Sequence, residues 1–589
     1  MMLRAKSSDK LPKVKYQLSL LLIASIFANS LLILISSSIN DSSKEFEAIA
    51  QAIPRPTEPS NLPALPDTLP KPQPFPPFQS PPSIPPPPSQ LNDSIIPETD
   101  VLIREIKVLG STVFSEAELQ QVVKPYLGKN ATIQDLLAIR SIITDLYINS
   151  GYLTSGAFLP LQAQDFKNGI ISIQVIEGEL ERIDINGLSR LQEDYVRSRM
   201  IPAGSRPLNI RNLEEGLQLL QLDPLFSSIQ ADLKAGRTVG RSVLQIELKE
   251  NDPWSSSLIV DNRESPSVGS LGVYASLGYR NLTGLGDSLR IDASGTEGTR
   301  KYGIQYDLPL NAQDDLQLRY NSNNSRIVEK PFSLIDINSR SQTVAIGYRH
   351  FLFRHPTSEL SLGLTLERRE SNDFLFGNIP FSFSIGSENG RSVVNVLRFS
   401  QEWIGRTIDQ VLAARSQFNV GLGIFDSTVN NTGTDGRFLS WQGQFQWVQA
   451  LDKDAISIFR LGAQLTSQSL LPTEQFGLGG VDTIRGYRQS LYVGDSGVSS
   501  SMELRFPILR SEAIGLIQVA PFIDFGAVWN NSPNSFAGIL GSTGLGLRWE
   551  INPNFRAKLE WAAQLVSTNF ATNASQPQSL FFSLQITGF

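Results

Sequence analysis

From Trp254 to the end of the chain, apolar and polar side chains alternate with a period of two. The segment 273–279 places Val, Ala, Leu and Tyr at every second position with small or polar residues between them, and 555–561 repeats the pattern. Successive side chains of a strand point to opposite faces of a sheet. The alternation therefore predicts strands with one apolar and one polar face.

The length and number of these segments favour a membrane barrel over a soluble sandwich. They run for about 9 to 15 residues, longer than the usual strand and suited to a tilted membrane crossing. Short links such as 313–314 and 552–553 alternate with longer polar links such as 370–391. We place sixteen strands, which begin near Ser255, Leu271, Asp287, Arg300, Asp315, Gln342, Glu359, Val393, Val411, Gly436, Ala455, Val498, Leu516, Ala537, Phe555 and Leu580.

An even number of strands is what an antiparallel bacterial barrel requires for closure. Backbone groups cannot stay unsatisfied in lipid, and closing the sheet removes its edges. We therefore expect residues 254–589 to form a transmembrane β-barrel of sixteen antiparallel strands. The modest hydrophobic content of 41% agrees with strands that have one polar face.

Residues 101–250 carry a different pattern, which occurs twice. An alternating strand that runs into Gly110 recurs before Gly187, and each copy continues as helix, helix, strand, strand. We expect two small α+β modules, at 101–178 and 179–250. Each has about the size that buries one small core between a sheet and two helices.

Capping sequences predict where the helices of these modules begin. In the first module Ser115-x-x-Glu118 and Thr132-x-x-Asp135 are typical capping boxes. In the second, we expect Ser189-x-x-Gln192 to open one helix and 209–222 to form the other. Each small sheet has free edges, which can accept an extended peptide by strand addition. The alternative is that the modules are only rigid spacers.

The amino-terminal hundred residues predict a leader and a spacer. Lysines and one arginine precede an apolar run at 18–35, and the small-x-small triplet at 48–50 offers a cleavage site, so we expect 1–50 to be a cleaved signal peptide. A retained membrane anchor is the competing interpretation, because the length of the run is near the lower bound for a spanning helix. Residues 51–98 are rich in proline and predict an extended linker.

Composition excludes most catalytic chemistry. The 589 residues include no Cys and two His, His350 and His355, so thiolate nucleophiles and zinc motifs are absent from the sequence. Its 51 basic and 57 acidic residues give no excess of positive charge for nucleic acid. We expect no catalytic residues, no metal, no cofactor and no enzymatic activity.

Three segments resemble a known family. The glycine-rich segment 476–506 contains Ile484, Arg485, Gly486 and Tyr487; a second segment contains Phe522, Asp524 and Gly526; and GYLTSGAFLPLQ at 151–162 contains Gly151, Tyr152, Leu153 and Pro160. With the tandem modules, these segments resemble the two-partner secretion transporters, the hemolysin activation and secretion protein family of the POTRA-bearing outer-membrane barrel superfamily. The resemblance covers nearly all of the chain after the linker.

The resemblance implies that 484–487 lies on a loop folded into the barrel lumen, with Arg485 against Asp524 on the inner wall. A guanidinium can make two charge-assisted hydrogen bonds to a carboxylate, and such a pair holds a loop well in a partly desolvated lumen. The alternative is an ordinary surface arginine and an ordinary lumen aspartate. Family members often carry an amino-terminal plug helix; here the candidate segment, 42–51, would be removed by cleavage at Ala50.

The resemblance also implies a function. We expect an outer-membrane protein, with its modules in the periplasm, that recognises an unfolded secreted protein and exports it. The implied partners are a large β-helical exoprotein of adhesin or hemolysin type and outer-membrane lipid, and we expect a single-chain barrel. The alternatives are an outer-membrane protein insertase of the same superfamily, which usually carries more modules, and a passive porin, which would need neither the modules nor the specialised loop.

Overall fold

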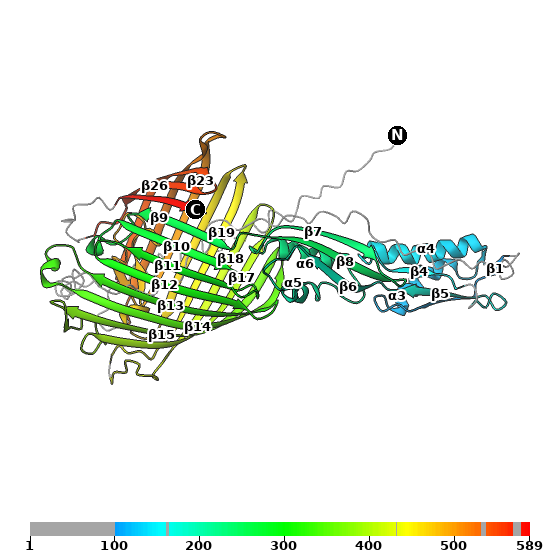
Figure 1. Cartoon of the computed structure of the whole chain (residues 1–589), viewed down its shortest axis with the longest axis horizontal. Helices are drawn as coiled ribbons and strands as arrows, with labels where there is room; N and C mark the ends of the chain where they lie inside the picture. Colours follow the sequence, from blue (N-terminus) through cyan, green and yellow to red (C-terminus); the bar gives the residue numbers. More distant parts are fainter. Residues whose placement is uncertain (1–99, 161–163, 432, 532–536, 569–578, 589) are drawn as a thin grey trace, which may run out of the picture. The chain divides into compact units, whose positions relative to one another are not determined.

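The computed structural model describes residues 100–160, 164–431, 433–531, 537–568 and 579–588 (Figure 1). The expected signal peptide at 1–50, the linker at 51–98 and the plug candidate lie outside the described residues. In the described part, no helix is both long and apolar enough to cross a membrane.

The first module is a three-stranded sheet with two main helices. Its sheet has the order β2-β5-β4, in which β2 is parallel and β4 antiparallel to the central strand. The elements are β1 (Val101–Leu102), β2 (Glu105–Leu109), α3 (Glu116–Val123), η1 (Lys124–Tyr126), β3 (Asn130–Ala131), α4 (Ile133–Asn149), β4 (Gly156–Phe158) and β5 (Ile170–Ile176).

Both predicted helix starts of this module are confirmed. The Thr132 hydroxyl accepts the Asp135 backbone N–H at 3.3 Å, and the Asp135 carboxylate accepts the Thr132 N–H at 2.8 Å. Ser115 and Glu118 make the same reciprocal pair at the start of α3. Because each cap satisfies two backbone groups locally, the short sequence motif is enough to place the helix.

The second module repeats this arrangement with the sheet order β6-β8-β7. Its α6 begins after Asn209, as expected, and buries Leu213, Leu217 and Leu220 against the sheet. The elements are β6 (Glu179–Asn186), α5 (Glu193–Met200), α6 (Ile210–Gln221), β7 (Phe226–Ala235) and β8 (Arg241–Glu250).

The expected helix start at Ser189 is wrong. Helix α5 begins at Glu193, and its N-cap residue Gln192 makes no side-chain capping bond. The N–H groups of Ser189, Arg190 and Leu191 instead donate to Oε1 of Glu250, at 2.8, 2.9 and 3.0 Å. A carboxylate some 60 residues away therefore takes the donors that a helix start would have used.

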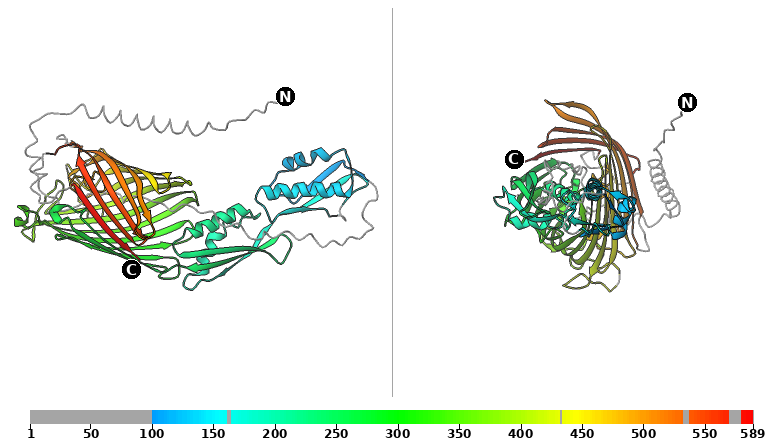
Figure 2. Two further views of the ribbon diagram at one scale, coloured as in Figure 1. Left: turned by 90° about the horizontal axis from the view of Figure 1, so that it is seen from above. Right: turned by 90° about the vertical axis from the view of Figure 1, so that its right-hand side faces the viewer.

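Sixteen antiparallel strands close into a barrel, as the sequence predicts (Figures 1 and 2). Consecutive strands pair around the wall, and β27 pairs with β9 to complete the closure. The strands are β9 (Trp254–Asp261), β10 (Gly272–Arg280), β11 (Ser288–Gly295), β12 (Thr299–Pro309), β13 (Asp314–Arg326), β14 (Asn338–His355), β15 (Ser358–Leu375), β17 (Arg391–Arg406), β18 (Gln410–Leu422), β19 (Leu439–Asp452), β20 (Ala455–Thr466), β23 (Ser496–Ser511), β24 (Gly515–Trp529), β25 (Ala537–Asn552), β26 (Phe555–Gln564) and β27 (Leu580–Thr587).

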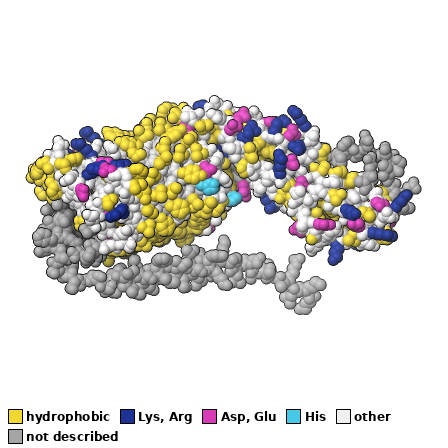
Figure 3. Space-filling view, turned by 90° about the horizontal axis from the view of Figure 1, so that it is seen from below, with side chains coloured by type: hydrophobic (Ala, Val, Ile, Leu, Met, Phe, Trp, Pro, Cys, Tyr) yellow, Lys and Arg dark blue, Asp and Glu magenta, His cyan; other side chains and the backbone are white. Residues whose placement is uncertain are grey.

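The apolar side chains form the outer face of this barrel. Strand register places Leu277, Ile291 and Ile304 side by side, and each is 46–47% exposed. Figure 3 shows the resulting cover of hydrophobic side chains on one face. Such exposure would be costly in water, whereas lipid provides the matching apolar surroundings.

Some strand ends differ from the sequence prediction. Strand β14 begins at Asn338 rather than near Gln342, β15 runs to Leu375 through part of the expected 370–391 loop, and β19 begins at Leu439 rather than at Gly436. The extended ends of β14 and β15 pair through polar residues such as Ser341 and Ser371. The alternation of apolar and polar residues stops there, but the backbone hydrogen bonds between the two strands continue. The sequence pattern therefore underestimates the strand length.

The remaining short elements lie in the links. The two-residue strand β16 (Ile379–Pro380) pairs with the end of β15. Between β20 and β23 the chain forms η5 (Pro472–Glu474) and a small hairpin of β21 (Phe476–Leu478) and β22 (Tyr492–Gly494). The other 3-10 turns are η3 (Pro266–Val268) and η4 (Phe332–Ile335).

Candidate functional site in the barrel lumen

The predicted loop motif lies between β21 and β22, against the inner face of the barrel. The turn before it passes through Gly479 and Gly480, which have φ angles of +112° and +95°. The Thr483 hydroxyl accepts the Gly479 N–H at 2.8 Å and stabilises this turn. The conformation favours glycine, because other residues rarely adopt a positive φ.

Arg485 makes a bidentate pair with Asp524. Its Nε donates to Oδ2 and its Nη2 to Oδ1, both at 2.8 Å, and its backbone N–H donates to Oδ2 at 3.1 Å. The Arg485 residue is 4% exposed and Asp524 is fully buried. The structure thus brings together the two residues that the resemblance paired.

Further carboxylates surround the same guanidinium. Nη1 of Arg485 donates to Glu503 at 2.7 Å and to Glu560 at 3.2 Å, and Nη2 donates to Ser501 at 3.1 Å. Charges this far from water need partners that satisfy them, and bidentate geometry with several acceptors supplies them. Glu503 and Glu560 were not foreseen from the sequence, although both occupy the polar phase of their strands.

Neighbouring cations balance these carboxylates. Glu503 accepts from Arg505 and Arg548, each at 2.7 Å, and Glu560 pairs with Lys558 at 2.9 Å. The result is a buried network across β23, β24, β25 and β26, with Arg485 as the member supplied by the loop. A loop displacement would leave the three wall carboxylates of Asp524, Glu503 and Glu560 short of one cation.

The ring of Phe522 packs against the Arg485 guanidinium. Its ring centroid lies 3.4 Å from Cζ of Arg485, which is cation–π geometry. Phe522 is 4% exposed, whereas its neighbours Ile523 and Phe525 are 41% and 43% exposed on the outer face. The strand phase therefore turns the Phe522 ring into the lumen, where Arg485 of the loop covers it.

The other motif residues pack the loop on the wall. Ile484 is fully buried with Leu478, Val528 and Leu540. At Gly526 a Cβ would come within 2.5 Å of Leu478 Cδ1, so this glycine allows the hairpin to approach β24 closely. Gly486 has φ +89°, and its carbonyl accepts Gln564 Nε2 at 2.6 Å.

Tyr487 ties the loop to the far end of β26. Its hydroxyl lies 2.7 Å from the Gly541 carbonyl and 2.8 Å from the Val566 carbonyl, and accepts the Val566 N–H at 3.2 Å. The Tyr487 side chain is 1% exposed. All four motif residues therefore make contacts that fix the same loop.

A second charged cluster holds the beginning of the loop on the opposite part of the wall. Arg398 donates to Glu474 at 2.9 and 3.1 Å, and to Glu367 at 2.9 Å. All three residues are less than 10% exposed. Glu474 is in η5, whereas Arg398 and Glu367 are in β17 and β15. Sequence reasoning missed this anchor, because only the strand register brings its members together.

A polar cavity of about 500 Å³ lies beside the loop. Its wall is formed by β9 to β14, and Thr473 and Arg369 border it on the loop side. Most of the lumen-facing side chains that line it are small and uncharged, such as Ser276, Ser294, Asn321, Asn323, Ser341 and Thr343. This side of the lumen differs from the opposite side, which the loop and its charged anchors fill.

The first-module signature lies where that module meets the second one. Gly151 has φ +94° and its carbonyl accepts the Ile210 N–H, at the start of α6, at 2.9 Å. Leu153 packs against the core of the second module, and the Tyr152 ring contacts Tyr147 edge to face. The Pro160 carbonyl accepts Gln164 Nε2 at 3.0 Å.

The histidines lie at the periplasmic end of β14. His350 Nδ1 lies 2.7 Å from Asp314 and His355 Nδ1 lies 3.2 Å from Glu215, with both imidazoles partly exposed. Among the described residues, no group of three or more Asp, Glu or His side chains could hold a metal ion.

Two family models and several known proteins match this chain. The family model for the haemolysin secretion/activation protein ShlB/FhaC/HecB matches residues 240–549, and the ShlB-type POTRA domain matches 101–178. The outer membrane transporter CdiB of Dickeya dadantii is 23% identical over 454 residues, covering 73% of this chain and 76% of that protein. The hemolysin transporter protein ShlB of Serratia marcescens is 24% identical, covering 46% and 48%.

A solved structure supports the same fold. CdiB from Escherichia coli superposes with a TM-score of 0.66 at 21% identity, covering 86% of this chain and 93% of the other. The family model spans more than half of the chain, and the barrel and module folds are those the family model and its POTRA domain require. The chain belongs to the haemolysin secretion/activation ShlB/FhaC/HecB family, a family of outer-membrane transporters whose POTRA modules lie in the periplasm.

Proposed function

We propose that this protein captures an unfolded secreted partner in the periplasm and exports it through its barrel. The observation that carries the proposal is the lumen loop, which Arg485 and Glu474 anchor beside an open polar cavity. A passive porin needs no loop held at both ends by buried charges. The loop and the two modules together favour a conduit for a specific polypeptide.

Capture would occur by strand addition to the modules. Strand β7 is ten residues long and pairs with β8 along one edge, while its other edge has no strand partner among the described residues. Unpaired backbone N–H and C=O groups can bind an extended chain of almost any sequence. The first module offers the shorter edges of β2 and β4 in the same way.

Passage would follow the wall of β10 to β14. Serine, threonine and asparagine side chains make individually weak hydrogen bonds to a passing backbone and carry no charge that would hold it. The anchored loop on the other side narrows the lumen. The residues 484–487, with Asp524, Phe522 and Gly526, would therefore shape the channel and keep the loop from blocking it.

The exported partner would be a large β-helical protein of adhesin or hemolysin type. In this scheme the transporter uses no nucleotide, cofactor or catalytic residue. Folding of the exported partner outside the cell would therefore give the transport its direction. The barrel would act as a single chain in outer-membrane lipid.

Deleting the gene and comparing surface and culture-fluid proteins tests the proposal. We expect the loss of one large exoprotein, with restoration by the intact gene. A general loss of barrel proteins from the membrane would show instead that the protein is an insertase. Unchanged exoproteins with a lower uptake of small solutes would favour a porin.

A further inference from the structure

The outer face of the barrel carries two arginines that have no carboxylate partner. Arg300 of β12 and Arg340 of β14 are both exposed, and the described part of the structure places no carboxylate within ion-pair distance of either guanidinium. Other arginines at the same end of the barrel are paired: Arg326 with Asp336 at 2.6 Å, and Arg391 with Glu370 at 2.9 Å. The two arginines therefore form an uncompensated positive patch.

Strand register brings these two arginines into one row. Arg300 lies opposite Asn324 of β13, and Asn324 lies opposite Arg340. Adjacent strands are about 4.8 Å apart, so the two arginine Cα atoms are about 10 Å apart with an amide donor between them. All three belong to the lipid-facing phase of their strands, in line with the exposed Tyr320, Ile304 and Val344.

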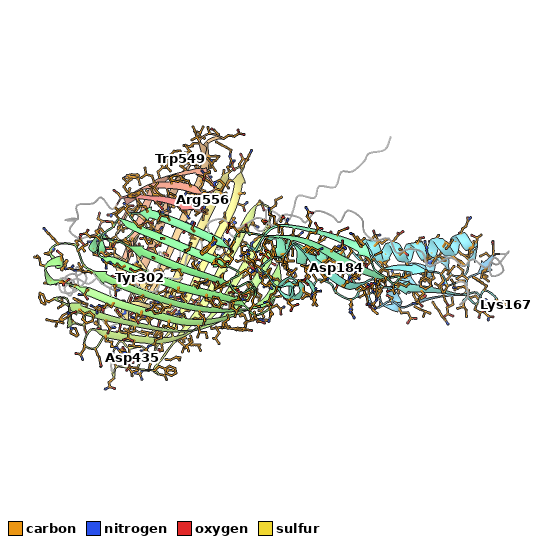
Figure 4. The ribbon with its side chains drawn as sticks, viewed as in Figure 1. Lys167, Asp184, Tyr302, Asp435, Trp549 and Arg556 are labelled. Carbon is orange, nitrogen blue, oxygen red and sulfur yellow. The ribbon has the colours of Figure 1, made fainter. Side chains whose placement is uncertain are left out.

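The depth of the row matches the level of lipid headgroups. Its strands run outward from the periplasmic turns, so the row lies at their extracellular ends. Tyr302, 55% exposed, is the next outward-facing residue on β12 and projects from the barrel wall (Figure 4). Tyrosines mark the interface between hydrocarbon and headgroups. The arginines lie two residues beyond the level of Tyr302 along the strands, roughly 7 Å farther toward the extracellular side. They therefore reach the polar headgroup region.

We propose that Arg300, Asn324 and Arg340 bind the anionic headgroup of an outer-leaflet lipid. A guanidinium binds phosphate or a similar oxyanion through two charge-assisted hydrogen bonds. Two guanidinium groups on either side of an amide can bind the same headgroup together. The Phe374 ring, 5.3 Å from Cζ of Arg340, holds that side chain against the wall. The occupant is a membrane lipid because the same surface continues directly into the apolar band below it. This site is independent of polypeptide export.

Lipid selectivity of the full chain tests this site. The protein is reconstituted in nanodiscs of equal amounts of phosphatidylglycerol and phosphatidylcholine, and the lipids that remain bound are identified by native mass spectrometry. We expect the unmodified chain to retain phosphatidylglycerol preferentially. Arg300→Gln and Arg340→Gln should each lower this retention about fivefold, which is the effect of one basic residue at an anionic membrane surface.

Arg326→Gln is the matched control, because it removes one charge from the outer face of a neighbouring strand where Asp336 already neutralises it. Its retention of phosphatidylglycerol should be unchanged, whereas Arg300→Lys with Arg340→Lys should weaken the preference, because an ammonium group lacks the two parallel donors of a guanidinium. Heat-dependent migration in gels verifies that each barrel is folded. Equal losses in all three glutamine variants, or no preference in the unmodified chain, would overturn the proposal.

Discussion

Arg485 and Asp524 are 39 residues apart in the sequence and are joined by two parallel hydrogen bonds of 2.8 Å inside the barrel. The pair is shielded from water, and the same guanidinium also reaches Glu503 and Glu560. The loop is consequently fixed by charge rather than by apolar packing alone. Breaking a buried pair of this kind by removing one partner typically costs about 3–5 kcal/mol.

Replacing Arg485 with alanine should therefore reduce export while the barrel still inserts. The substitution leaves three buried carboxylates with one cation fewer, so the loop should leave its position on β24. Export is measured as exoprotein in the culture fluid, and insertion as heat-dependent migration of the barrel. Arg556→Ala is the control, since Arg556 is exposed and its ion pair with Glu550 is long, at 3.7 Å. Normal export by Arg485→Ala would remove the loop from the mechanism.

Gly486→Ala should destabilise the loop through sterics. A Cβ at this position would lie 3.0 Å from Cβ of Ala562, on a backbone with φ +89°. The conformational strain and the contact together should cost about 1–3 kcal/mol. Gly433→Ala, in the link between β18 and β19, is the control for a positive-φ glycine outside the lumen loop, because Gly433 has φ +86° but a Cβ there would meet no atom of the described residues within 4 Å. Protease cleavage within the loop should increase in Gly486→Ala and stay low in Gly433→Ala.

Weakening the second anchor should widen the lumen. Glu474→Gln removes the charge that Arg398 contacts at 2.9 Å, so the start of the loop should detach from β17. Single-channel conductance in planar bilayers is expected to rise. Glu402→Gln serves as the control, since Glu402 pairs with Arg415 on the wall and, within the described part of the structure, has no hydrogen bond or ion pair to the loop. Equal conductance of the two variants would show that Glu474 does not anchor the loop.

The second module should lose local stability in acid. Burial opposes ionisation of Glu250, but the N–H groups of Leu191, Arg190 and Ser189 outweigh it and lower the pKa of this carboxyl from 4.5 to about 2. A lowered pKa in the folded state means that ionised Glu250 stabilises the fold. This contribution is complete above about pH 4.5, declines below it and is lost below about pH 2.

Hydrogen exchange of the full chain measures this effect at residues 189–191. Their opening free energy, corrected for intrinsic exchange, should fall as the pH is lowered through that window. Glu250→Gln should remove the dependence, whereas Glu247→Gln, at an exposed position of the same strand, should keep it. A pH dependence that survives in Glu250→Gln would assign the effect to another group.

Local patterns account for the elements that the sequence predicted correctly. Thr132 and Asp135 are three residues apart and cap α4 without help from the rest of the chain. Ser189 and Gln192 have the same spacing but fail, because Glu250 takes the backbone donors that the cap would use. Sequence spacing does not contain this long-range contact.

The sequence by itself determined the barrel, the two modules and the phase that turns Asp524 inward and Phe525 outward, because strand alternation and helix capping act over a few residues. Only the tertiary structure decided which charges meet. Glu503 and Glu560 join Arg485, and Glu474 joins Arg398, through the register of strands far apart in the chain. Register is a property of the closed sheet, since each strand is positioned by both of its neighbours at once.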